Sequence, residues 1–256
     1  MAIYDKPVRL LMKEFVRDQN IKKEQIISRD QVTTWFTTKY PKIKVGTISA
    51  HLLKMSVNAP SRIHYAVSRV GEDDLLYQID SRHFRLYDAD NDPSPIYISK
   101  PSPEETVEGA SGLDQEEPEL AHQTGFAYES DLRDFLSRNL HIIEPGLHLY
   151  EDEGITGVEF PVGGRFIDIL ALDRQRNYVV IELKVSRGYD RVIGQLLRYI
   201  AWIEKNQAEP TQRVRGVIIA REISDDLHLA SSKISSVELF EYDLSVSLRK
   251  VSKYNI

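Results

Sequence analysis

The chain has 256 residues, no cysteine and a formal net charge of −6. A chain of this length can bury a sizeable core or form two modest domains, and the lack of cysteine excludes disulfides and thiolate metal sites. No apolar run reaches the length of a membrane span, and the first residues lack a secretory signal pattern. We therefore expect a prokaryotic cytoplasmic protein that does not contact a membrane.

Charge is distributed unevenly along the chain. Residues 1–70 hold 13 Lys and Arg against 5 Asp and Glu, whereas residues 101–125 hold 7 acids and no Lys or Arg. The basic part favours an anionic partner. The acidic part is rich in Pro, Gly, Ser and Glu without apolar periodicity, which predicts a flexible linker, with a short packed loop as the alternative. We therefore expect domains at 1–100 and 126–256, joined by a linker at 101–125.

The first domain is predicted to contain three helices followed by β-structure. Apolar residues from Val8 to Val16 follow helical spacing. Ser28 with Gln31 forms a capping-box start for a second helix, which Pro41 ends. Segments of β-type follow the third helix, and the last two are joined by the turn at 80–82. The expected elements are helices at 8–16, 28–40 and 47–56 and β-segments at 63–67, 75–79 and 83–87.

This order of elements predicts a winged helix-turn-helix domain. In such domains the third helix usually enters the DNA major groove and the wing contacts the backbone or the minor groove. The basic charge favours DNA as the partner, and a protein-interaction or dimerisation module is the alternative. The side chains expected to contact DNA are Lys42, Lys44, Thr47, Ser49, His51, Lys54 and Arg82.

The second domain carries three charges within two strongly apolar segments. Asp168 lies in the first segment, and Glu182 and Lys184 lie in the second, after a short polar turn that suggests a hairpin. Residues two apart on a strand share a face, so Glu182 and Lys184 point the same way. Two adjacent carboxylates repel unless a cation lies between them, and their oxygens suit a hard ion such as Mg²⁺. A neighbouring lysine can stabilise developing negative charge or help to activate water.

A plain structural explanation exists for the same pattern, because edge strands often carry Glu and Lys toward solvent. The flanking residues argue against it. Val179, Val180, Ile181, Leu183 and Val185 form an almost continuous apolar run, which is typical of a central strand buried on both faces. Charged side chains in such a strand are rarely without a purpose. The pattern therefore indicates a metal-dependent site that cleaves phosphodiesters.

These residues resemble the core of a known nuclease superfamily. Asp168 followed by Glu182-Leu183-Lys184 looks like the PD-(D/E)XK nuclease motif. Residues 128–139 are similar to the first core helix of the NucS/EndoMS mismatch endonucleases. Residues 194–199 resemble the helix after the ELK strand of those enzymes, and residues 214–220 resemble their following strand. The likeness extends over roughly residues 126–245.

The resemblance implies an α/β fold with a restriction-endonuclease-like mixed sheet flanked by helices. It implies that Asp168 and Glu182 bind a metal, Mg²⁺ with Mn²⁺ as a substitute, and that Lys184 is the catalytic lysine. It also implies that Glu129 and Gln195 complete the site. Residues 1–100 do not resemble the N-terminal part of the NucS/EndoMS enzymes, which puts mismatch specificity in doubt.

We therefore expect a Mg²⁺-dependent DNA endonuclease of a restriction or modification-dependent type, targeted by the winged helix. Double-stranded DNA is the expected substrate, and cleavage of both strands suggests a homodimer. The alternatives are a repair nuclease acting on mismatched or branched DNA, a nuclease acting on RNA, and a non-catalytic DNA-binding regulator with a nuclease-like scaffold.

Overall fold

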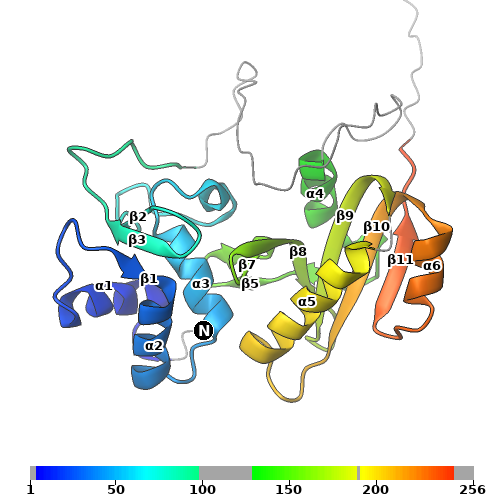
Figure 1. Ribbon diagram of the computed structural model, residues 1–256, viewed down its shortest axis with the longest axis horizontal. Helices are drawn as coiled ribbons and strands as arrows, with labels where there is room; N and C mark the ends of the chain where they lie inside the picture. The colour runs from blue at the N-terminus through cyan, green and yellow to red at the C-terminus, as the bar shows by residue number, and fades with distance from the viewer. Residues whose placement is uncertain (1–3, 98–128, 189–190, 245–256) are drawn as a thin grey trace, which may run out of the picture.

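The computed structural model describes residues 4–97, 129–188 and 191–244 (Figure 1). We call residues 4–97 the N-terminal region and residues 129–244 the C-terminal region. The predicted linker at 101–125 lies outside the described residues. No helix in the described parts of the chain combines the length and the apolar character needed to cross a bilayer.

The N-terminal region contains three helices and a small sheet. The sheet has the strand order β1-β3-β2, and both pairings are antiparallel. The Ser28 hydroxyl accepts a hydrogen bond from the Gln31 amide over 3.1 Å, so the predicted cap of the second helix is confirmed. The elements are α1 (Val8–Asp18), β1 (Ile27–Ser28), α2 (Arg29–Lys39), α3 (Val45–Lys54), η1 (Pro60–His64), β2 (Leu76–Gln78) and β3 (His83–Leu86).

Two details of this region differ from the prediction. The segment at 63–67 was expected to be a strand, but Pro60–His64 forms the 3₁₀ helix η1. Pro60 occupies the start of this turn, where its fixed φ and missing N–H are tolerated. The short strand β1 was not predicted, because only Ile27–Ser28 pairs with β3 and two residues carry no periodicity.

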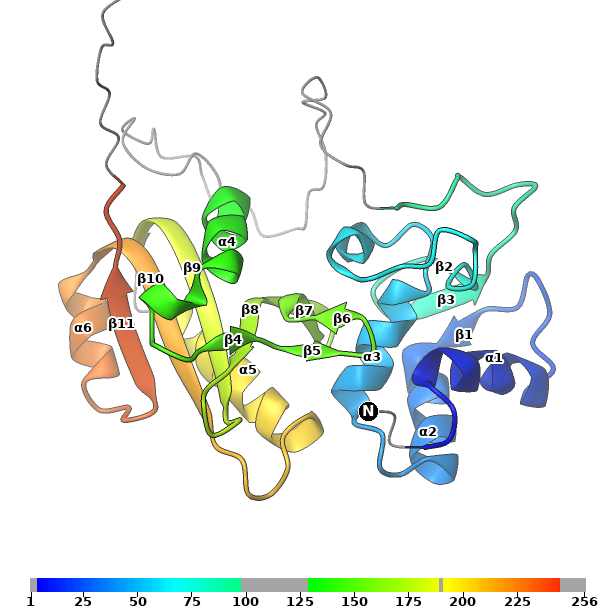
Figure 2. The ribbon, with the colours of Figure 1, turned by 180° about the vertical axis from the view of Figure 1, so that it is seen from behind.

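The C-terminal region is built on a curled, six-stranded mixed sheet with helices on both faces (Figures 1 and 2). The strand order is β11-β10-β9-β8-β4, and β7 also pairs with β8. Strands β9, β10 and β11 are parallel, whereas β8 is antiparallel to β9. The elements are α4 (Glu129–Arg138), η2 (Leu140–Ile142), β4 (His148–Leu149), β5 (Glu151–Asp152), β6 (Ile155–Thr156), β7 (Val158–Val162), β8 (Arg165–Leu172), β9 (Tyr178–Gly188), α5 (Arg191–Asn206), β10 (Val214–Ile223), α6 (Asp225–Ser231) and β11 (Val237–Glu241).

The two faces of the sheet bury separate apolar clusters. Leu132 and Leu136 of α4 pack with Ile181 of β9 on one face. Leu196 of α5 packs with Val180 of β9 on the other. Because neighbouring side chains of a strand point to opposite faces, the apolar run of β9 fills both clusters. Strand β9 is therefore the central strand that the sequence predicts.

Helix α3 lies between the rest of the N-terminal region and the C-terminal region (Figures 1 and 2). It contacts β6, β7 and α5. Gly46 allows a close approach at this contact, since a Cβ there would displace the end of the Gln207 side chain. Lys54 Nζ donates a hydrogen bond to the Glu153 carbonyl over 2.9 Å. The helix that was expected to face DNA is therefore an interface helix.

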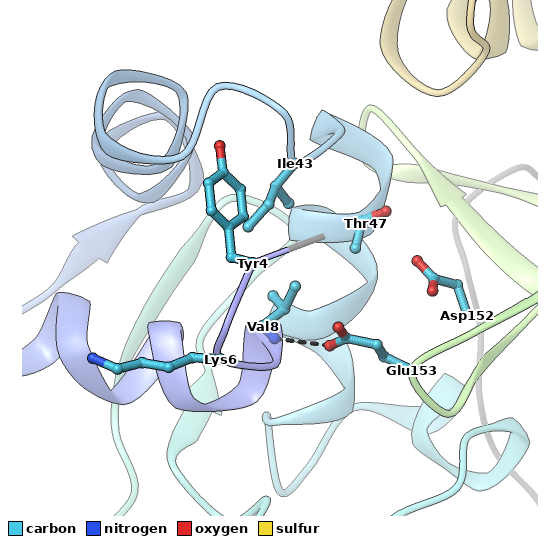
Figure 3. A pocket seen from close by; sticks show the side chains of 7 residues that line it. All are labelled: Tyr4, Lys6, Val8, Ile43, Thr47, Asp152 and Glu153. Carbon is cyan, nitrogen blue, oxygen red and sulfur yellow. Dashed lines mark hydrogen bonds between the residues drawn. The ribbon is translucent and has the colours of Figure 1, made fainter. Parts of the chain in front are cut away.

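The turn between β5 and β6 strengthens this interface. The Glu153 carboxylate accepts a hydrogen bond from the Val8 amide over 2.8 Å at the start of α1 (Figure 3). Pro7 precedes this helix and has no side-chain group that could cap it. A carboxylate at a helix N-terminus is favourable because it faces unpaired N–H groups and the positive end of the dipole. Glu153 therefore takes the place of a local cap and joins the two regions.

Candidate active site

The site begins where β8 and β9 separate. Their ladder runs from Leu172↔Tyr178 to Ile169↔Ile181. At the next position the Asp168 side chain replaces the ladder, because its Oδ2 accepts the Leu183 backbone N–H over 2.9 Å. The carboxylate is thereby fixed at the diverging ends of the two strands.

Glu182 is buried on the α5 side of the sheet. Its side chain is 2% exposed, and its Oε1 accepts a hydrogen bond from Gln195 Nε2 over 2.6 Å. The same amide nitrogen lies 3.2 Å from the Tyr199 hydroxyl, one helical turn further along α5. Among the described residues, Glu182 Oε2 is buried and has no hydrogen-bond partner. Such an atom is costly to bury, so this oxygen is suited to a ligand.

Lys184 connects the strands to α4. Its Nζ donates to Glu129 Oε2 over 3.1 Å and lies 3.3 Å from Glu182 Oε1. The structure thus brings together all five residues that were predicted to form the site, from α4, β8, β9 and α5. Their catalytic roles stay a prediction.

The electrostatics of the cluster follow from burial. Burial raises the pKa of Asp168, against the opposing effect of the Leu183 hydrogen bond. Burial also raises the pKa of Glu182, and the Asp168 carboxylate adds to this rise. Burial disfavours the Lys184 ammonium, but the surrounding carboxylates outweigh that effect and raise its pKa. Lys184 therefore stays charged, and a further cation would favour the ionisation of both acids together.

A divalent cation fits these residues. The unpartnered Glu182 oxygen and the adjacent Asp168 carboxylate offer hard oxygen ligands. No cluster of three or more His, Cys, Asp or Glu suited to a metal occurs among the described residues. Mg²⁺ typically occupies a site of this kind, in which two protein carboxylates are completed by oxygens from water or substrate.

The residues expected to contact DNA are placed differently. Thr47, Ser49, His51 and Lys54 are buried in the interface that α3 makes, so the expectation of an outward-facing α3 is wrong. The physical reason is that strands more than ninety residues later cover this face. Lys44 is partly exposed and lies 3.0 Å from Glu209. Lys42 and Arg82 are exposed, and their contact with DNA stays a prediction.

Part of the positive charge of the N-terminal region is paired inside that region. Most of the acidic partners in these pairs lie beyond residue 70, outside the segment in which the excess of Lys and Arg was counted. The excess of Lys and Arg at residues 1–70 therefore overstates how much positive charge is available to bind an anionic partner. The pairs within the region are Lys6–Glu14, Lys23–Asp88, Arg9–Glu72, Arg62–Asp74, Arg85–Asp92 and Lys39–Asp18.

Two charged residues beside the site were not identified from the sequence. Arg133 lies four residues after Glu129 on α4, and its Nη1 is 2.9 Å from Glu159 Oε1 of β7. The four-residue spacing was a usable signal for Arg133, since such residues share a helix face. Glu159 carries no comparable signal, because it lies within an ordinary apolar strand pattern.

Two family models match separate parts of the chain. Residues 128–244 match the family model described as "Endonuclease NucS C-terminal domain", and residues 7–86 match "Domain of unknown function (DUF7669)". The C-terminal region is thus NucS-like. The sequence prediction of such a region is confirmed, while the winged helix stays a prediction.

Relatives in sequence are archaeal proteins named Endonuclease NucS. That of Methanocaldococcus jannaschii is 28% identical over 114 residues, which is 44% of this chain and 39% of the relative. That of Sulfolobus acidocaldarius is 31% identical over 98 residues, or 38% of this chain and 35% of the relative. The match therefore spans well under half the length of these relatives.

Two solved structures show a weaker likeness. A repair endonuclease from Pyrococcus abyssi has 21% identity and a TM-score of 0.39, covering 52% of this chain and 50% of the other. An EndoMS–dsDNA complex has 22% identity and the same TM-score of 0.39, covering 52% and 51%.

Proposed function

We propose that this protein is a divalent-metal-dependent DNA endonuclease. The observation that carries the proposal is the convergence of Asp168, Glu182 and Lys184 at the diverging ends of β8 and β9, within a NucS-like region. A non-catalytic scaffold is less well supported, because it has no need of a buried carboxylate oxygen such as Glu182 Oε2, which has no partner in the part of the chain that the structure describes. Nuclease relatives also favour an enzyme.

Each side chain of the site has a role in this proposal. Asp168 and Glu182 hold the metal, with Gln195 fixing the orientation of Glu182. A bound Mg²⁺ supplies polarisation of the scissile phosphate and lowers the pKa of a bound water. Lys184, whose Nζ donates a hydrogen bond to Glu129, orients the attacking water or offsets the charge that develops on the phosphate.

The substrate is proposed to be double-stranded DNA carrying a structural defect. The relatives are named Endonuclease NucS, and the similar solved structures are a repair endonuclease and an EndoMS complex with double-stranded DNA. These names favour the mismatch or branched-DNA alternative over a restriction enzyme. The defect that is recognised is left open, since residues 7–86 match a different family model of unknown function.

The N-terminal region is proposed to be a winged-helix-like module that does not read DNA through its third helix. Its element order supports the first part, with three helices and the sheet order β1-β3-β2. The burial of His51 and Ser49 on α3 supports the second. Its exposed wing turn, which carries Arg82, is the part that we propose for DNA contact. A homodimer would place two sites on two strands.

Cleavage by the purified full chain tests the proposal. The protein is incubated with Mg²⁺ or Mn²⁺ and with intact, mismatched, branched and modified duplexes and RNA. We expect cleavage of a mismatched or branched duplex, and no cleavage by Asp168→Asn. Asp134→Asn is the matched control, because Asp134 is exposed on α4. Equal cleavage by Asp168→Asn and the wild type would overturn the assignment of the site.

A further inference from the structure

Helix α4 contributes a second charged side chain beside the site. Arg133 and Glu129 are four residues apart and therefore share a face of the helix. Glu129 is bonded to Lys184 on β9, whereas Arg133 is ion-paired to Glu159 on β7. The two contacts lie on either side of β8, which carries Asp168. Helix α4 is thus anchored to both strands that flank the Asp168 strand.

Glu159 has an unusual backbone. Its φ is 47°, which lies in the left-handed region that side chains with a Cβ rarely adopt. It lies between the pairs Val158↔Ile169 and Phe160↔Ile167, which places it opposite Asp168 in the β7–β8 ladder. Such conformations persist where surrounding contacts hold them, and they concentrate at functional sites.

The pair is poorly accessible to solvent. The Arg133 and Glu159 side chains are 13% and 26% exposed, and Arg133 Nε is buried without a hydrogen-bond partner among the described residues. Burial disfavours the Glu159 carboxylate, but His64 and Arg133 outweigh that effect and lower its pKa. Glu159 is therefore an ionised partner for the guanidinium.

The other oxygen of Glu159 faces the N-terminal region. His64 Nε2 lies 3.6 Å from Glu159 Oε2. His64 itself is fixed, because its carbonyl accepts a hydrogen bond from the Thr156 hydroxyl over 2.9 Å. One side chain of η1 is thus connected to α4 through Glu159 and Arg133.

We propose that Arg133 and Glu159 are positioning residues that hold α4 and Asp168 in the geometry needed for metal binding, and that His64 extends this network into the N-terminal region. The inference rests on the proposed function and adds a structural role for the N-terminal region.

Glu159→Gln in the full chain is the first test. Mn²⁺ binding is measured by calorimetry, and cleavage is measured as kcat and KM for DNA. We expect the Mn²⁺ dissociation constant to rise about tenfold, in the range for residues that orient metal ligands, with lower kcat and unchanged KM. Glu151→Gln, an exposed glutamate of β5, should equal the wild type. Wild-type Mn²⁺ affinity in Glu159→Gln would overturn the proposal.

A double variant separates position from charge. Glu159→Gln with Arg133→Met removes the pair without changing net charge. If the pair positions the site, metal binding and kcat stay impaired. Full restoration would show that Glu159 only balances the Arg133 charge, and would overturn the positioning role. Arg138→Met is the control on the exposed side of α4. If Glu159→Gln does not fold, Glu159→Asn replaces it, since Asn tolerates the left-handed conformation.

His64→Leu tests the extension into the N-terminal region. We expect a several-fold weaker Mn²⁺ affinity and rescue by His64→Gln, which keeps a hydrogen-bond donor. Wild-type behaviour of His64→Leu, beside an impaired Glu159→Gln, would overturn this part of the proposal. If wild-type protein cleaves no nucleic acid, the proposed function fails, whereas the Mn²⁺ titrations still decide whether the network supports the metal site.

Discussion

Gln195 holds one oxygen of Glu182 and leaves the other without a partner. The bond from Gln195 Nε2 to Glu182 Oε1 is 2.6 Å long, while Oε2 is buried and receives no hydrogen bond from the described residues. An unsatisfied buried acceptor costs free energy, and an unpaired buried charge costs more. The metal-free protein therefore bears a local penalty that a bound cation removes.

Metal should stabilise the wild type and leave Glu182→Gln unchanged. A metal that binds only the folded state at a concentration 100 times its Kd contributes about 2.7 kcal/mol. We expect Mg²⁺ or Mn²⁺ to raise the Tm of the wild type. Without metal, Glu182→Gln should unfold at the same or a higher temperature, because an amide has no charge to bury. A clear Tm increase of Glu182→Gln with metal would contradict the assignment of Glu182 as a ligand.

Lys184→Met should separate metal binding from cleavage. Methionine keeps the apolar stem of this half-buried side chain but removes the ammonium that contacts Glu129 and Glu182. Because electrostatic groups of this kind contribute about 10²–10³ in rate, we expect single-turnover cleavage at saturating Mg²⁺ to fall by that factor. Calorimetric titration should still detect metal. Lys205→Met, at an exposed position of α5, serves as the control. Unchanged cleavage by Lys184→Met would show that the Lys184 ammonium only balances the charge of the carboxylates.

The site was predictable because its chemistry interrupts a strong pattern. The almost continuous apolar run of β9 singles out Glu182 and Lys184 as charges on a buried strand. The resemblance to a nuclease family added Glu129 and Gln195. Both lie on helices, where a polar residue usually faces solvent and does not by itself indicate a site. The separation of β8 from β9 at Asp168 could not be predicted, because it depends on pairing geometry and not on residue type.

The role of α3 could not be predicted for a different reason. Its polar residues predict a solvent-exposed face, but the sequence of a helix does not reveal which other part of the chain covers that face. The covering β5–β6 turn, with Glu153, lies about a hundred residues later. Similarly, Glu159 lies in a plain strand pattern, and its left-handed backbone has no signal in the residue types around it.

DNA binding should therefore depend on the exposed cations and not on α3. Arg82→Gln and Lys42→Gln should weaken binding at all sequences and each reduce the dependence of log Kd on log salt by about 1. Lys54→Met should leave this slope unchanged and lower Tm, because it removes the bond to the Glu153 carbonyl. Fluorescence anisotropy at several salt concentrations makes the comparison. A reduced salt slope in Lys54→Met would restore α3 as a DNA contact.

His51 should make the stability of the protein depend on pH. Its side chain is 0% exposed, and burial lowers its pKa to about 4, against the opposing effect of the bond to the Thr47 carbonyl. The unfolded chain has an ordinary histidine pKa of about 6.5. Between these two values the unfolded state binds a proton that the folded state does not. Stability therefore falls as pH decreases through this window, by up to about 3 kcal/mol for this group.

Denaturant unfolding of the wild type and of His51→Gln from pH 7 to pH 4.5 measures this contribution. As the pH falls, the unfolding free energy of the wild type should decrease more than that of His51→Gln, because glutamine does not titrate. His148→Gln, at an exposed position of β4, should follow the wild type. Glu153, which lies 3.6 Å from His51 Nε2, and Lys54 are the charged groups beside the ring. If a protonated His51 instead paired with Glu153, its pKa would rise and acid would favour the wild type over the variant. The sign of the pH-dependent difference therefore decides whether the histidine at the centre of the interface is neutral or charged.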